Sequence, residues 1–88
     1  MKKIIFLILV LAITYQTYGQ VGIGTNSPDS SAMLEVQSTE RGILFPRMTT
    51  AQRNGIVSPA NGLYVFDTNS NSLWYFNGTV WINTTAEA

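Results

Sequence analysis

The sequence contains no cysteine and no histidine, and only 11% of its 88 residues are charged. Without cysteine, disulfide bonds and thiolate metal sites are excluded. The lack of histidine removes the commonest general base and a frequent transition-metal ligand. Asp29 and Glu35 are the one conceivable acid–base pair, but nothing else in the sequence converges on them, so solvated carboxylates are the simpler interpretation. We therefore predict that the chain is not an enzyme and uses no cofactor or metal.

Positive charge is also scarce, because five Lys and Arg balance five Asp and Glu. Lys2 and Lys3 lie at the N-terminus, which leaves no basic stripe to neutralise a phosphate backbone. We therefore predict no nucleic-acid partner. Interchain ion pairs are conceivable, although solvated surface charge is the simpler interpretation; the residues concerned are Arg41, Arg47 and Arg53, with Glu35, Glu40 and Asp67 as acidic partners.

The N-terminus has the pattern of an export signal. Lys2 and Lys3 precede an unbroken apolar run, Ile4 to Ile13, which is followed by a more polar exit that ends at Gly19. This three-part pattern is typical of a secretory signal peptide. A membrane anchor is the alternative, but the apolar run is shorter than the roughly 20 residues of a spanning helix. We expect a cleavable signal helix over residues 1–19, with membrane association only through this segment before cleavage.

The rest of the chain is predicted to form an extended leader, residues 20–31, a small β-rich module, residues 32–83, and a flexible tail, residues 84–88. The leader is rich in Gly, Ser, Thr, Asn and Pro, which favour turns. Its two neighbouring glycines, Gly22 and Gly24, lack the strand–turn–helix context of a phosphate-binding loop. We interpret them as part of a flexible leader.

The first part of the module alternates short apolar runs with turn residues. The segment AMLEVQS predicts a short strand, with a single helical turn as the alternative. ILFPRM predicts a second strand, at a sheet edge because Pro46 cannot donate a ladder hydrogen bond. MTTAQRNGI predicts a short helix that Thr49 and Gln52 cap reciprocally and that Gly55 ends in a left-handed conformation.

The last part of the module predicts two antiparallel strands, GLYVFD and LWYFN, dense in β-branched and aromatic residues. Asn77-Gly78 favours a two-residue type I′ turn into a further strand, with Trp74 opposite Trp81. The fold class predicted is mainly β, a small antiparallel sheet or meander with one short helix, preceded by the signal-peptide helix.

Alternation along these strands makes both sides of the hairpin apolar. One face carries Trp74, Phe76 and Trp81, and the other carries Leu73, Tyr75, Val80 and Ile82. So small a chain can cover one face itself, so we expect other copies to cover the second. The aromatic residues predicted to mediate this self-association, or alternatively to stack on glycans, are Tyr64, Phe66, Trp74, Tyr75, Phe76 and Trp81.

The ordered strings VGIGTNSPDSSAMLEVQST, RGILFPRMTTAQRNGI, SPANGLYVFDTNSNSLWYFNG and TVWI resemble a module of exported, phage tail-fibre-like or trimeric adhesin-like surface proteins of Gram-negative bacteria. In such proteins the module follows the signal peptide and often precedes a repetitive stalk. The resemblance implies a homo-oligomer, with a trimer favoured, that forms the base or head of a surface fibre. It also implies a secreted or cell-surface location, with a surface glycan or another envelope protein as further candidate partners.

Overall fold

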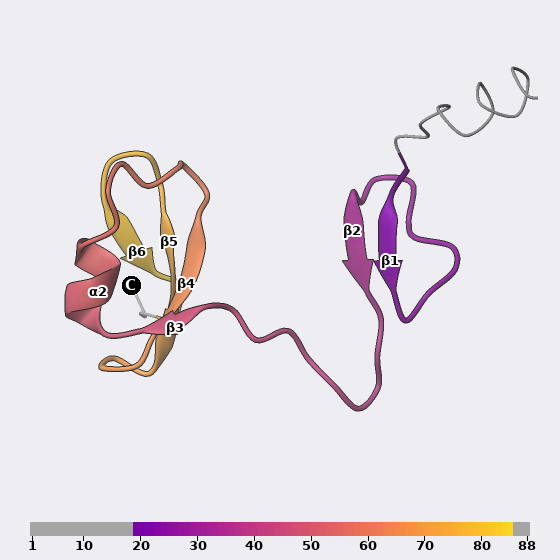
Figure 1. Ribbon diagram of the computed structural model, residues 1–88, viewed down its shortest axis with the longest axis horizontal. Helices are drawn as coiled ribbons and strands as arrows, with labels where there is room; N and C mark the ends of the chain where they lie inside the picture. Colours follow the sequence, from indigo (N-terminus) through magenta and orange to yellow (C-terminus); the bar gives the residue numbers. More distant parts are fainter. Residues whose placement is uncertain (1–18, 86–88) are drawn as a thin grey trace, which may run out of the picture. The chain divides into compact units, whose positions relative to one another are not determined.

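The computed structural model describes residues 19–85. The chain divides into two compact units between Arg41 and Gly42, and we refer to residues 19–41 as unit 1 and residues 42–85 as unit 2 (Figure 1). The predicted signal helix, except for Gly19, lies outside the described residues, as do residues 86–88 of the predicted tail. The predicted boundaries of leader, module and tail remain predictions.

Unit 1 is a two-stranded parallel ribbon. Strand β1, Val21–Ile23, pairs with β2, Leu34–Val36, in a register that places Val21 beside Leu34 and Ile23 beside Val36. The strand predicted within AMLEVQS is thereby confirmed, and the helical turn is excluded. The connection between the strands is held by the Asp29 amide, which donates a hydrogen bond of 2.8 Å to the Glu35 carboxylate.

The two leader glycines have a steric role that the interpretation as flexible leader missed. At Gly24, φ is +80°, and a Cβ atom there would lie 2.0 Å from the carbonyl oxygen of Gln37. A Cβ at Gly22 would lie 2.6 Å from the carbonyl oxygen of Thr25. Side chains at either position would therefore collide with backbone, and the glycines permit the close approach that closes the ribbon.

Unit 2 is a four-stranded sheet in the order β3-β4-β5-β6. Its strands are β3, Arg47–Met48, β4, Tyr64–Asp67, β5, Ser72–Phe76, and β6, Trp81–Asn83. The pairs β4–β5 and β5–β6 are antiparallel, as predicted, whereas β3 runs parallel to β4. The edge position predicted from Pro46 is confirmed, since β3 follows this residue directly and forms one edge of the sheet.

The helix of unit 2, α2, Thr50–Asn54, lies against one side of the sheet (Figure 1). The predicted capping box is confirmed, because Thr49 Oγ1 accepts the Gln52 amide and Gln52 Oε1 accepts the Thr49 amide. Gly55 ends the helix at φ −83°, so the predicted left-handed stop is wrong. The Gly55 amide instead remains bonded to helical carbonyls, including that of Ala51. Within residues 19–85 no helix has the length and apolar character needed to cross a bilayer.

The turn predicted at Asn77-Gly78 is wrong in type and length. Four residues, 77–80, connect β5 to β6, so that Phe76 pairs with Trp81 and Trp74 pairs with Asn83. Within this loop only Gly78 has a positive φ, +95°. Asn77 Oδ1 accepts the backbone amides of Thr79 and Val80. Because the register shifts by two residues rather than one, the side chains within β5 and β6 keep their predicted faces. Val80, predicted to share the face of Leu73 and Tyr75, lies in the loop instead.

Candidate interaction surface

The sheet of unit 2 has two contrasting faces. Helix α2 packs on the first, the covered face, which comprises Val65, Asp67, Ser72, Trp74, Phe76 and Trp81. The second, the open face, carries Phe45, Tyr64, Phe66, Leu73, Tyr75 and Ile82. Within residues 42–85 the four strands form this one sheet and the helix lies on the covered face, so no other helix or strand covers the open face.

The covered face is organised around Arg53, which α2 directs onto the sheet. Its guanidinium carbon lies 3.8 Å from the centroid of the Trp74 ring and 5.4 Å from that of Trp81. Its Nε donates to Asp67 Oδ2 at 3.0 Å, and both side chains are buried. A buried cation thus has a carboxylate partner and two aromatic rings, so the ion pair joins the helix to the sheet.

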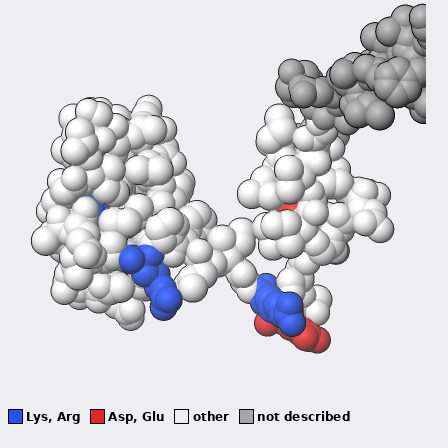
Figure 2. Space-filling model, viewed as in Figure 1, with Lys and Arg blue, Asp and Glu red and all other residues white. Residues whose placement is uncertain are grey.

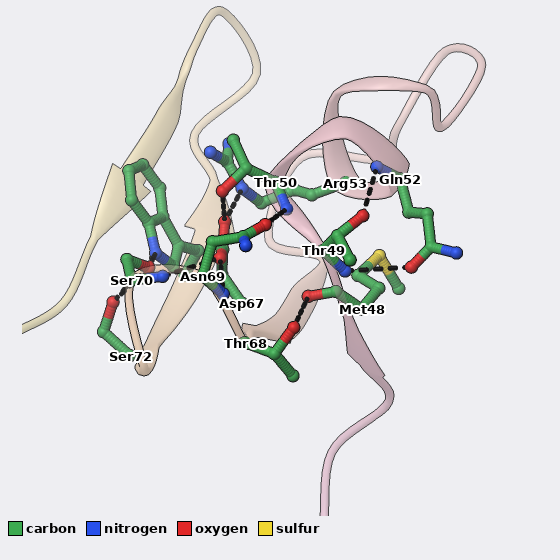
Figure 3. Close-up of polar contacts among 11 residues, drawn as sticks. Met48, Thr49, Thr50, Gln52, Arg53, Asp67, Thr68, Asn69, Ser70 and Ser72 are labelled. Carbon is green, nitrogen blue, oxygen red and sulfur yellow. Dashed lines mark hydrogen bonds and ion pairs between the residues drawn. The ribbon is translucent and has the colours of Figure 1, made fainter.

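Asp67 is the acceptor at the centre of this cluster (Figure 3). Thr50 donates its hydroxyl to Oδ2 at 2.8 Å, and the amides of Asn69 and Ser70 donate to Oδ1 at 2.9 and 3.0 Å. Burial of the carboxylate acts to raise the pKa of Asp67, but the hydrogen bonds from Ser70, Thr50, Arg53 and Asn69 outweigh it. The pKa of Asp67 therefore lies well below its ordinary value of 3.8, and the carboxylate is held ionised.

The Trp74 ring is also held at its polar end. Its Nε1 donates to the hydroxyl of Ser70 at 2.9 Å and to that of Ser72 at 3.0 Å. With one ring face against Arg53 and its N–H bonded within the chain, Trp74 is a structural element of unit 2. Among residues 19–85 no group of acidic side chains is suited to hold a metal ion.

The open face is an apolar row that crosses the sheet. Tyr64 stacks on Tyr75 with ring centroids 5.5 Å apart, and Phe45 lies 5.9 Å from Tyr64 on the other side. Ile82 continues the row as the cross-strand partner of Tyr75. The Tyr64 side chain is 41% exposed, and the other three are half-buried. Figure 2 shows that most of the visible surface of each unit is uncharged.

The six aromatic residues predicted to interact fall on both faces. Trp74, Phe76 and Trp81 lie on the covered face, where Phe76 and Trp81 meet edge to face at a centroid separation of 5.4 Å. Tyr64, Phe66 and Tyr75 lie on the open face. The sheet therefore brings together only half of the predicted set on one surface.

Sequence reasoning missed two features of this region. The first is Phe45, which was not among the predicted residues. It alternates with Arg47 in ILFPRM, and Arg47 pairs with Phe66, so strand alternation could have placed Phe45 on the open face. The second is the Arg53–Asp67 pair, which lies within one chain and is buried, so the interpretation as an interchain pair or solvated surface charge is wrong for these two residues. No local pattern reveals such a pair, because its partners come from separate elements.

Comparison with known proteins identifies the family of this chain. No curated protein and no solved structure matches the chain. The profile of one family, described as a phage tail like trimerisation region, matches residues 22–88 and thus extends through both units. This match confirms the resemblance to tail-fibre-like proteins and agrees with an uncovered apolar face in unit 2. The chain belongs to the phage tail-like trimerisation regions and is a self-associating structural module that forms homotrimers.

Proposed function

We propose that the chain is exported and that its trimer forms the base or head of a tail-fibre-like or adhesin-like assembly on the surface of a Gram-negative bacterium. Three observations support the proposal: the signal-like N-terminus, the family of trimerisation regions, and the open face of unit 2. The open face is the observation on which it chiefly rests. An apolar surface that a small domain leaves uncovered is a natural site for contact between copies.

The open face suits contact between identical copies in composition. Its central rings, Tyr64 and Tyr75, combine large apolar area with hydroxyl groups that can remain at a wet rim. Among residues 42–85 the one charged side chain on this face is Arg47, which lies at its margin on the edge strand β3 and pairs in register with Phe66. Copies can therefore meet at the centre of the sheet without opposing charges of the same sign.

A substitution at the open face tests this function. We expect Tyr64→Lys to dissociate the trimer, because the contact would have to bury a positive charge from each copy. Molecular mass under native conditions, measured by light scattering, should fall to that of one chain. The control is Val57→Lys, which adds the same charge at a side chain that is 88% exposed and outside the open face, and should leave the mass unchanged. A wild-type protein that stays a single chain at high concentration would refute the proposal.

The alternative function is carbohydrate binding through aromatic rings, which the partial exposure of Tyr64 favours. The covered-face ring of Trp74 is occupied by Arg53, so Tyr64 and Tyr75 are the rings available for such stacking. A glycan array probed with the wild-type protein separates the two functions. Binding that Tyr64→Ser abolishes, in a protein that is a single chain, would favour the carbohydrate function.

A further inference from the structure

The ribbon of unit 1 has an apolar side of its own. Register and alternation place Val21, Ile23, Leu34 and Val36 on the same side, since paired residues of parallel strands point the same way. Val21, Ile23 and Leu34 are 53%, 56% and 57% exposed, and Val36 is half-buried. We refer to these four side chains as the ribbon face.

The connection between β1 and β2 covers the other side of the ribbon. A Cβ atom at Gly22 would lie 2.8 Å from Pro28 Cγ, so the connection packs directly on this strand. The Glu35 side chain points to the same side and accepts the Asp29 amide. The connection therefore covers the side of the ribbon that carries Gly22 and Glu35, and the ribbon face on the other side stays uncovered.

Unit 1 cannot be stable with this arrangement alone. Each strand has three residues, and none of residues 19–41 is buried. An isolated two-stranded ribbon is at best marginally stable in water, because it needs a further layer against its apolar side. Something outside unit 1 must therefore supply that layer.

Resting on the trimeric function proposed above, we propose that the ribbon faces of the three copies pack against one another and form a second contact between them, separate from the open face of unit 2. Around a threefold axis each ribbon face meets its own equivalents, which requires a surface without charge. All four side chains of the ribbon face meet this requirement. The trimerisation-region match also begins at Gly22 and includes both strands.

The first test removes apolar character while keeping β propensity. In the full-length protein we expect V21T/I23T/L34T to raise the concentration at which half of the trimer dissociates by about tenfold or more, because three copies each lose apolar burial. Val57→Thr is the matched control and should not change it. Both tryptophans lie in unit 2, so unchanged tryptophan fluorescence would show that the triple variant keeps this unit folded.

The second test detects the contact directly and uses the lack of cysteine in the chain. We expect Ile23→Cys to give disulfide-linked pairs of chains under mild oxidation at low protein concentration. Val57→Cys is the control at a more accessible position, 88% exposed against 56% for Ile23, and should stay unlinked. Linkage is read on denaturing gels without reductant.

The outcomes separate this inference from the function on which it rests. A wild-type protein that is a single chain refutes the trimer itself. A wild-type trimer whose V21T/I23T/L34T variant is equally stable, with Ile23→Cys unlinked, refutes only the ribbon contact. The triple variant could instead stay trimeric while unit 2 loses stability. That result would mean that the ribbon face packs within its own chain, and it would also overturn the inference.

Discussion

Arg53 has an environment that explains why a charged residue is among the best-buried side chains of unit 2. Its guanidinium combines an ion pair with Asp67 and ring contacts with Trp74 and Trp81. A planar, weakly hydrated guanidinium is suited to such stacking, whereas an ammonium group is not. The cluster fixes α2 on the covered face, so this helix does not cover the rings of the open face.

Removal of one partner of this pair should strongly destabilise unit 2. We expect Arg53→Met to lower the midpoint of thermal unfolding by roughly 10 °C or more, because the Asp67 carboxylate would stay buried without its cation. Circular dichroism of the two tryptophans would follow the transition. The double variant R53M/D67N should recover part of the loss, and equal midpoints for wild type and Arg53→Met would contradict a structural role for the pair.

The depressed pKa of Asp67 predicts how stability depends on pH. Unfolded, this carboxyl titrates near its ordinary 3.8, whereas the folded group stays ionised to a lower pH. Below pH 3.8 the unfolded state therefore binds a proton that the folded state does not, and stability falls as the pH falls through the folded pKa. Above about pH 5 the contribution of Asp67 is complete and constant. Urea unfolding between pH 2 and 7 should show this loss, and Asp67→Asn should reduce it.

Among individual residues, the sequence revealed capping roles but not tertiary pairing. Thr49 and Gln52 were correctly predicted because a capping box is a local pattern four residues long. Arg53 and Asp67 were treated as surface charges because their burial depends on how α2 meets β4, which no local pattern encodes. Half of the predicted aromatic set is likewise on the covered face, since strand alternation alone does not say which face the helix will occupy.

Among the elements, helix α2 is too short to form without help. Five residues give few helical hydrogen bonds, so its start depends on the capping box and its packing on Arg53. We expect Thr49→Ala to cost about 1 kcal/mol of unfolding free energy, since the Gln52 amide loses its acceptor. Thr49→Ser keeps the hydroxyl and should cost far less. Urea denaturation of both variants measures the difference, and equal losses would argue against the cap.

The parallel ribbon depends on Gly24. We expect Gly24→Ala to separate β1 from the residue after β2, because the new Cβ would overlap the Gln37 carbonyl. The Gln37 amide, which donates to the Ile23 carbonyl at 2.8 Å, should then lose its protection from hydrogen exchange. Gly42→Ala is the control, because a Cβ there meets nothing within 4 Å. Retained protection at Gln37 in Gly24→Ala would contradict the close approach.

Apolar alternation predicted the positions of most strands, but not their partners or connections. The strands around Tyr64 and Tyr75 were expected to pair, and they do. The parallel pairings of β1 with β2 and of β3 with β4 were not anticipated, because the partners are far apart in sequence. At Asn77 the side chain accepts two amides of the loop, and this local bonding replaces the two positive φ angles on which the predicted turn relied.

For the whole molecule, the proposed export makes a direct prediction about the product. We expect the protein recovered from outside the cytoplasm of a Gram-negative host to begin at Gln20, because cleavage after Gly19 would follow a small residue. N-terminal sequencing and intact mass measure this. A substitution of Leu7 by Arg, which interrupts the apolar run, should retain the precursor inside the cell, whereas Gln16→Arg, outside the run, should not. Export of an uncleaved chain would contradict a removable signal.

The parallel direction of β1 and β2 also determines how the polypeptide travels through unit 1. In an antiparallel hairpin the chain returns to the end at which it entered, but here both strands advance the same way, from Val21 to Ile23 and from Leu34 to Val36. Gln20 and Gln37 are consequently held at opposite ends of the ribbon. Unit 1 therefore carries the polypeptide forward along the ribbon instead of returning it, which is what the fibre-like assembly proposed above would require of a segment within it.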